Sequence, residues 1–181
     1  MSAQVEEALA GFVETLRGLS SGIGWTPRAN LHLTLRFLGD RVPAEKLERL
    51  DCALEQIATT ISPFAIEVRG TGVFPNPNRP RVIWVGLQSG SLIQLAAEVE
   101  NAAVDAGFEA EQRNYTPHLT IGRIRDPRAW RAVLTSIVDA SDRDFGSTQV
   151  DSMALYQSRL GSYPTYIQLA VYALSGSRGS L

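Results

Sequence analysis

The apolar positions of the chain change between two spacings, which separates predicted helices from predicted strands. Over residues 3–19 and 43–57 apolar side chains recur every three or four residues, as they do along one face of a helix. Over residues 31–37 every second residue is apolar, which is typical of a strand with one buried face. The chain therefore mixes helices and strands from its start.

The stretch Arg81–Leu87 differs because it is apolar on both faces, which predicts a central strand of a sheet. The Pro-, Asn- and Arg-rich residues 75–80 before it predict a loop. The same two spacings predict two further helices, over residues 92–103 and 126–137, the latter with Trp130, Val133, Leu134 and Ile137 facing inward. They also predict strands over residues 63–74, around His118–Thr120, over 149–158 and over 165–174.

The order of these elements repeats once along the chain. Each half, residues 1–80 and residues 81–174, contains a helix, a strand with the letters HLT, another helix and two further strands. The two motifs are 86 residues apart (118 − 32), which is too long a period for a solenoid. We predict an α+β fold in which residues 1–181 form a single bilobal domain. Its two pseudo-symmetric lobes would each be an antiparallel sheet with helices outside, around a central cleft, and residues 175–181 would be a loose tail.

Composition fits a globular protein of the cytoplasm. Of the 181 residues 44% are hydrophobic and 20% charged, and the net charge of −2 argues against a broad basic surface for long duplex nucleic acid. Cys52 is the single cysteine, which excludes an intrachain disulfide, and its helical setting predicts a small residue on a helix rather than a catalytic thiol. The start resembles no signal peptide, and no apolar stretch approaches the roughly 18 residues of a membrane span. We expect a cytoplasmic monomer without a membrane partner.

His32 and His118 are the only histidines, and both stand in the tripeptide HLT. Threonine occupies 11 of the 181 positions, so both histidines would have threonine two positions later by chance in roughly 0.4% of arrangements. In a strand, residues two apart share a face and lie about 6.5–7 Å apart. Each motif therefore presents an imidazole and a hydroxyl together, which favours a functional site over two isolated structural histidines.

The matched pair favours acid–base chemistry on a phosphate without a metal. A metal site usually needs three or four ligands, and neither motif has a carboxylate beside its histidine. A serine or cysteine nucleophile would need one histidine rather than two. Because an imidazole has an ordinary pKa near about 6.5, one can act as base and the other as acid near neutrality. Threonine hydroxyls can meanwhile donate hydrogen bonds to phosphate oxygens.

Two H-x-T motifs at this spacing resemble those of the two-histidine phosphoesterase superfamily. The segments NLHLTLRFLGD, GVFPNPNRPRVIWVGL and YTPHLTIGRI are similar to those of the RNA 2′,3′-cyclic phosphodiesterases, also called 2′-5′ RNA ligases, and the likeness runs from about residue 3 to residue 173. The resemblance implies a hydrolase that opens the terminal 2′,3′-cyclic phosphate of RNA, or of related nucleotides, to a 2′-phosphomonoester. It implies no metal or cofactor, and a reverse activity that joins RNA ends through a 2′-5′ linkage.

By position, the resemblance implies that His32 is the general acid that protonates the departing ribose 3′ oxygen. His118 would be the general base that takes a proton from the attacking water. The pseudo-symmetry of the two halves leaves the reverse assignment open. Thr34 and Thr120 would hydrogen bond to the phosphate.

Arg123 and Phe37 each follow a histidine by five residues. The resemblance implies that Arg123 neutralises the phosphate, yet an odd spacing puts it on the strand face opposite His118 unless Gly122 allows a bulge or ends the strand. The resemblance implies that Phe37 stacks on a base, with a place in the hydrophobic core as the alternative.

Three further arginines, Arg36, Arg79 and Arg81, are lesser candidates for contact with RNA, against the alternative that they are simply solvated. Family members usually begin with a short apolar strand before the first helix, whereas this sequence starts at the helix; either the start lies further upstream or one sheet lacks a strand. Two functional alternatives stay open. One is the same chemistry on a small cyclic nucleotide or an ADP-ribose cyclic phosphate, and the other is a non-catalytic module that binds RNA ends.

Overall fold

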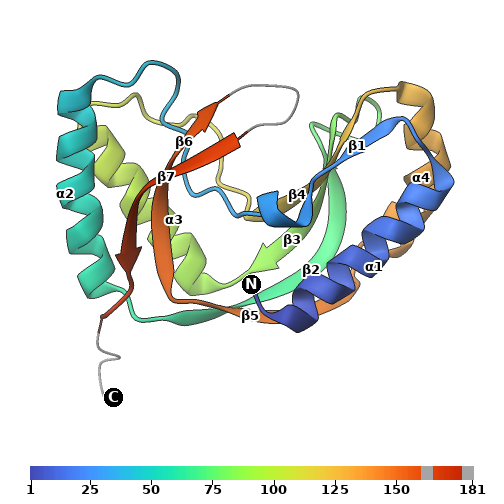
Figure 1. The fold of residues 1–181 in the computed structure, drawn as a ribbon, viewed down its shortest axis with the longest axis horizontal. Helices are drawn as coiled ribbons and strands as arrows, with labels where there is room; N and C mark the ends of the chain where they lie inside the picture. Colours follow the sequence, from blue (N-terminus) through green and yellow to red (C-terminus); the bar gives the residue numbers. More distant parts are fainter. Residues whose placement is uncertain (160–164, 177–181) are drawn as a thin grey trace. The chain divides into compact units, whose positions relative to one another are not determined.

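The structure of the chain, a computed structural model, describes residues 1–159 and 165–176 (Figure 1). The helices are α1 (Ala3–Leu19), α2 (Ala44–Thr60), α3 (Gly90–Asp105) and α4 (Pro127–Asp139), and the 3-10 turn η1 covers Arg28–Asn30. The strands are β1 (Ile23–Trp25), β2 (Phe64–Phe74), β3 (Val82–Gln88), β4 (His118–Ile124), β5 (Asp144–Val150), β6 (Ser152–Arg159) and β7 (Thr165–Ala173). The predicted α+β class is confirmed.

The chain forms two compact units, and each is assembled from three separate segments. Unit 1 contains residues 1–34, 65–89 and 116–148. Unit 2 contains residues 35–64, 90–115 and 149–181. Each of the two sequence halves therefore supplies chain to both units.

Strands β1 to β5 form one sheet in the order β1-β4-β3-β2-β5. The pairs β1–β4, β4–β3 and β3–β2 are antiparallel. The middle position of β3 confirms the prediction from its apolar residues on both faces, because a central strand has neighbours above and below the sheet. This sheet carries the second HLT motif at the start of β4.

Helices α1 and α4 lie side by side in unit 1 and contact β1 and β4 respectively (Figure 1). Ser2 caps α1 and Asp126 caps α4, each accepting a hydrogen bond from a backbone N–H of the first turn. The apolar stripe of α1 is buried, and each such side chain contributes about 1.5–3 kcal/mol to folding; it consists of Val5, Leu9, Phe12 and Leu16. In α4 the predicted inward position of Leu134 is wrong. It is 37% exposed because the buried stripe passes through Trp130, Val133 and Ile137 and leaves it on the flank.

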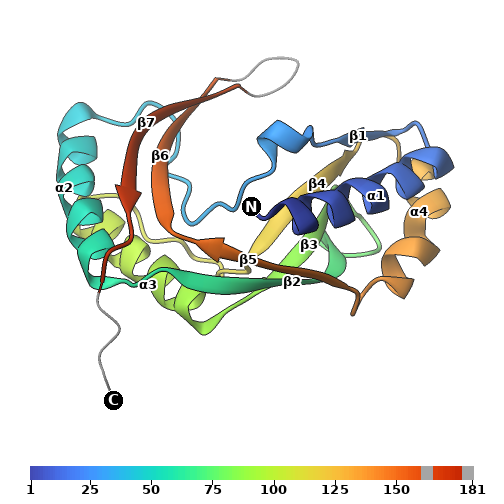
Figure 2. The ribbon, with the colours of Figure 1, turned by 60° about the horizontal axis from the view of Figure 1, so that its bottom comes forward.

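Unit 2 contains α2 and α3, which pack side by side (Figure 2), and the antiparallel pair β6–β7. Leu50 and Leu54 of α2 are buried, as are Leu95 and Val99 of α3. Tyr172 of β7 donates a hydrogen bond to Asp51 of α2, which ties the hairpin to the helix. Among the described residues, no helix has the length and apolar character needed to cross a membrane.

The predicted strand over residues 31–37 is wrong in extent, since only Leu33 forms a bridge, to Leu119 of β4. Between the pairs Trp25–Gly122 and Leu33–Leu119 the first chain advances by eight residues (33 − 25) and β4 by three (122 − 119). The five extra residues belong to the stretch 26–32, which includes the 3-10 turn η1.

Two other expectations differ from the structure. Strand β5 was not predicted, because its sequence DFGSTQV is polar and contains Gly146. In the expected loose tail, the N–H groups of Ser175 and Gly176 donate to the carbonyls of Ala58 and Ile61. The rest of that tail, residues 177–181, lies outside the described residues.

Candidate active site

The two HLT motifs lie next to each other in unit 1. The antiparallel bridge between Leu33 and Leu119 joins their central residues, and Leu119 is buried. Continuing this register by one residue in each direction puts His32 opposite Thr120 and Thr34 opposite His118. Residues on the same diagonal of an antiparallel pair are about 7–8 Å apart. The register of this bridge predicts that the two imidazoles lie on one face, at a separation that suits a phosphate between them.

Both imidazoles make the same local hydrogen bond. His32 Nδ1 lies 2.8 Å from the carbonyl oxygen of Asn30, and His118 Nδ1 lies 2.7 Å from that of Thr116. A carbonyl oxygen only accepts, so Nδ1 carries the hydrogen in both rings and proton transfer falls to Nε2. The repeat of this bond two residues before each histidine gives the two motifs matching ring orientations as well as matching sequences.

A bulge in β4 resolves the position of Arg123. Trp84 pairs with Thr120 and Ile83 pairs with Gly122, so one extra residue, Ile121, is inserted in β4. A single inserted residue reverses the alternation of faces beyond it. Arg123 therefore shares a face with Thr120, and its side chain is exposed. The bulge that the sequence suggested near Gly122 is therefore present. A contact between Arg123 and the phosphate stays a prediction.

Two aromatic side chains that were not predicted flank His118. The Phe74 ring lies edge-on to the imidazole with centroids 5.0 Å apart, and the Trp84 ring lies 6.5 Å away. The two aromatic rings are themselves 5.3 Å apart. A signal was available in the sequence, because the period of two in β3 puts Trp84 on the face opposite the buried Ile83 and Val85.

Gly72 leaves the space that the Trp84 ring occupies. The two residues are paired across β2 and β3, and a Cβ atom at position 72 would lie 2.2 Å from Trp84 Cζ2. The indole N–H is buried without a hydrogen-bond partner among the described residues, which indicates that packing holds the ring.

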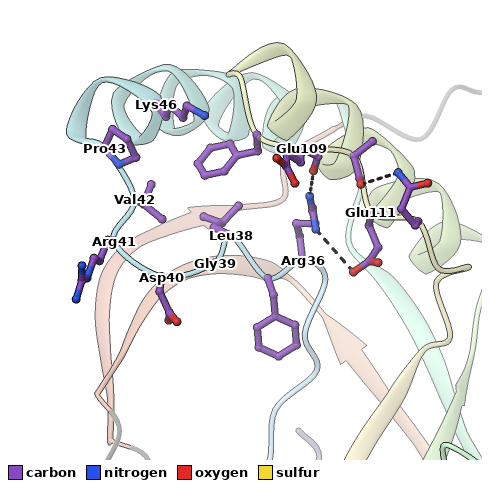
Figure 3. Close-up of a pocket in the computed structure, with 14 residues that line it drawn as sticks. Arg36, Leu38, Gly39, Asp40, Arg41, Val42, Pro43, Lys46, Glu109 and Glu111 are labelled. Atoms are coloured by element: carbon purple, nitrogen blue, oxygen red, sulfur yellow. Dashed lines mark hydrogen bonds and ion pairs between the residues drawn. The ribbon is translucent and has the colours of Figure 1, made fainter.

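Phe37 and Arg36 belong to unit 2, where they line a pocket of about 520 Å³ (Figure 3). Phe37 is 74% exposed, so its alternative place in the core is wrong and a stacking role stays a prediction. Arg36 is neither solvated nor open to RNA. Its Nε lies 2.6 Å from a Glu100 carboxylate oxygen, another nitrogen donates to the Glu109 carbonyl, and its side chain is 12% exposed.

Other candidates from the sequence are on the surface. Arg79 and Arg81 are exposed in the segment between β2 and β3. Cys52 lies on α2, as predicted, and is exposed. Within residues 1–159 and 165–176, no three side chains of His, Cys, Asp or Glu are grouped so that they could hold a metal ion.

Comparison with known proteins gives the family. Residues 5–161 match the model of the 2′-5′ RNA ligase superfamily. The RNA 2′,3′-cyclic phosphodiesterase of Methanothermobacter thermautotrophicus is 32% identical over 180 residues, which covers 96% of this chain and 97% of that protein. The crystal structure of TT0787 of Thermus thermophilus is similar with a TM-score of 0.76 and 28% identity, covering 96% of this chain and 94% of that one. Escherichia coli LigT complexed with 3′-AMP is similar with a TM-score of 0.70 and 26% identity, covering 94% and 92%. The chain belongs to the 2′-5′ RNA ligase superfamily.

Proposed function

We propose that this protein hydrolyses the terminal 2′,3′-cyclic phosphate of RNA to a 2′-phosphomonoester, with His32 and His118 as its acid and base. The observation that carries the proposal is the antiparallel contact of the two HLT motifs, in which both rings make the same Nδ1 hydrogen bond. Relatives named RNA 2′,3′-cyclic phosphodiesterase, and the LigT complex with 3′-AMP, support a nucleotide phosphate as the ligand.

The reaction needs one proton removed and one supplied on opposite sides of phosphorus. Nε2 of the neutral imidazole takes a proton from water as the water oxygen attacks phosphorus. The bond from phosphorus to the ribose 3′ oxygen breaks, and Nε2–H of the charged imidazole protonates that oxygen. The products are a 2′-phosphate and a 3′ hydroxyl, and solvent restores both rings. The family resemblance makes His32 the acid and His118 the base.

The groups around the histidines stabilise the charge on the phosphate. Thr34 and Thr120 donate hydrogen bonds to its oxygens, and Arg123 supplies positive charge from the same face of β4. No step requires a metal ion, because the imidazoles move both protons. With the 5′ hydroxyl of a second RNA in place of water, the same two proton transfers join the ends: its oxygen bonds to phosphorus as the bond to the ribose 3′ oxygen breaks, which leaves a 2′-5′ linkage and a 3′ hydroxyl.

The test identifies which ribose hydroxyl keeps the phosphate after the protein has acted on an RNA of defined end. An oligonucleotide ending in a 2′,3′-cyclic phosphate is incubated with the protein in EDTA, and the product phosphate is assigned by ³¹P NMR. The proposal predicts a 2′-phosphate, formed at the same rate with and without EDTA. A 3′-phosphate product, or activity that disappears with EDTA and returns with added metal, contradicts it. A His118→Ala protein is the control against a contaminating nuclease.

A further inference from the structure

Four arginines meet where β4 ends in unit 1. They are Arg79, Arg81, Arg123 and Arg125, called here the arginine corner. Val82 pairs with Arg123, and the N–H of Ile124 donates to the carbonyl of Arg81. Arg79 belongs to the turn that begins at Asn76, whose carbonyl and side-chain oxygens both accept from its N–H. Backbone pairing therefore brings the loop before β3 against the end of β4.

The positive charge of this corner is not compensated. Its four side chains are exposed, and none has an ion pair with another described residue. Asp126, next in sequence, is bound by Arg128, whose hydrogen bonds hold the pKa of that carboxyl below its usual range. Of the eleven other described arginines, Arg41, Arg131, Arg143 and Arg159 also lack an ion pair, so the corner differs in gathering four such arginines in one place. The remaining seven are paired: Arg17, Arg28, Arg36, Arg49, Arg69, Arg113 and Arg128.

Two of the four arginines share the sheet face of the candidate active site. The bulge at Ile121 puts Arg123 on the face of Thr120, and Arg125 follows two residues later on the same face. Gly24 of β1 pairs with Arg123. A Cβ atom at Gly24 would lie 2.8 Å from Arg125 Nε, so the glycine gives the Arg125 side chain room to lie across β1.

We propose that the arginine corner binds the phosphodiester backbone of the RNA on the 5′ side of the cyclic phosphate through Arg79, Arg81 and Arg125, while Arg123 serves the reacting phosphate, an inference that rests on the proposed function. Arginine binds phosphate through charge and paired N–H donors. Residues two apart on a strand are about 6.5–7 Å apart, so Arg123 and Arg125 continue a line of anion-binding groups that starts at Thr120. When the terminal cyclic phosphate of an RNA lies at the histidines, the backbone phosphates that precede it are therefore within reach of the arginine corner.

The size of the corner determines the class of substrate. A duplex-binding protein neutralises many phosphates with a broad basic surface, whereas the net charge here is −2 and the corner offers only four arginines. A few backbone contacts without contact to base edges suit a single-stranded end of any sequence. Oligonucleotides are therefore better substrates than cyclic mononucleotides, which have no further phosphate to bind.

The test compares two substrates in one double variant, Arg81→Ala with Arg125→Ala. The substrates are a six-nucleotide RNA ending in a 2′,3′-cyclic phosphate and 2′,3′-cyclic AMP. For the RNA, kcat/KM is expected to fall by about 10–100-fold. A plot of log kcat/KM against the logarithm of the salt concentration should also become less steep by about 1.4, because each of the two lost phosphate contacts accounts for about 0.7. For 2′,3′-cyclic AMP, kcat/KM of the double variant is expected to stay within about twofold of the wild-type value. Arg17→Ala, which removes an exposed arginine paired with Glu14, is the matched control and leaves both rates unchanged.

Equal losses on both substrates, or no loss on either, overturn the inference. A second measurement separates its failure from failure of the proposed function. Fluorescence anisotropy of a labelled six-nucleotide RNA ending in a 2′-phosphate reports binding without turnover. Weaker binding by the double variant than by Arg17→Ala supports the corner even in a protein that hydrolyses neither substrate, and equal binding refutes it.

Discussion

Gly72→Ala tests whether packing around Trp84 positions His118. The added Cβ would lie 2.2 Å from Trp84 Cζ2, whereas ordinary contact begins near 3.4 Å, so the ring must move by at least 1.2 Å (3.4 − 2.2). Overfilling of this kind costs about 1–3 kcal/mol. Since 1 kcal/mol shifts Tm by about 2–4 °C in a chain of this size, we expect Tm to fall by about 2–12 °C.

The displacement is expected to reach catalysis as well. The Trp84 ring contacts Phe74, whose ring lies edge-on to His118. A shift of about 1 Å at a catalytic group costs up to about 10²-fold in rate. We therefore expect kcat/KM for cyclic phosphate hydrolysis to fall by about 10–100-fold at a temperature where the variant is still folded.

A matched control and a rescue make the result specific. A Cβ atom added at Gly11 of α1 would meet no side chain or neighbouring element within 4 Å, so Gly11→Ala is expected to raise stability by about 0.5–1 kcal/mol without changing the rate. Trp84→Phe removes the clashing atoms, so Gly72→Ala should cost at least about 1 kcal/mol less in that background. Two results speak against a role of Trp84 packing in positioning His118: Gly72→Ala behaves like Gly11→Ala, or Gly72→Ala lowers the free energy of unfolding by the same amount with Phe at position 84.

Three further predictions concern separate features. His32→Ala and His118→Ala are each expected to lower cyclic phosphate hydrolysis by about 10²–10⁴-fold with little change in Tm, and a near-normal rate in either variant would remove that residue from the chemistry. Thr71→Val removes the 2.6 Å hydrogen bond from the buried Thr71 hydroxyl to the Ile137 carbonyl, so urea unfolding should show a loss of about 1–2 kcal/mol; an unchanged midpoint contradicts this. Burial raises the pKa of Tyr115 to about 12, so the folded protein keeps the phenol proton that the unfolded chain loses above about pH 10. Because deprotonation then favours the unfolded chain, the free energy of unfolding declines as pH rises from 10 to 12. Tm should therefore fall less steeply over that range in Tyr115→Phe, and an identical decline in both proteins speaks against it.

Elements with a strong hydrophobic period were predicted well from the sequence. The stripe of α1 and the two apolar faces of β3 follow from local spacing alone, because each residue's burial depends on its own position in the element. The strand around Leu33 failed for a different reason. Its alternation is genuine, but the five extra residues within the stretch 26–32 leave one bridge to β4, and the pairing of distant segments is not encoded in local spacing.

The candidate residues come from the sequence and their roles stay predictions, whereas their surroundings come from the structure. Repetition of HLT was enough to single out the two histidines, while the face of Arg123 depended on a bulge that one strand cannot reveal. The partners of Arg36 lie 64 and 73 residues away in sequence, at Glu100 and Glu109, so its burial could not be predicted from its neighbours. Phe74 beside His118 likewise requires the register of three strands.

The central claim is that two imidazoles act on one phosphate, one as acid and one as base. Its most direct test is the dependence of kcat/KM on pH for the wild-type protein and for His32→Ala and His118→Ala, with an RNA cyclic phosphate as substrate. We expect a bell-shaped profile for the wild type, loss of one limb in one variant and of the opposite limb in the other. A profile with a single limb in the wild type, or a complete bell in either variant, would contradict the account.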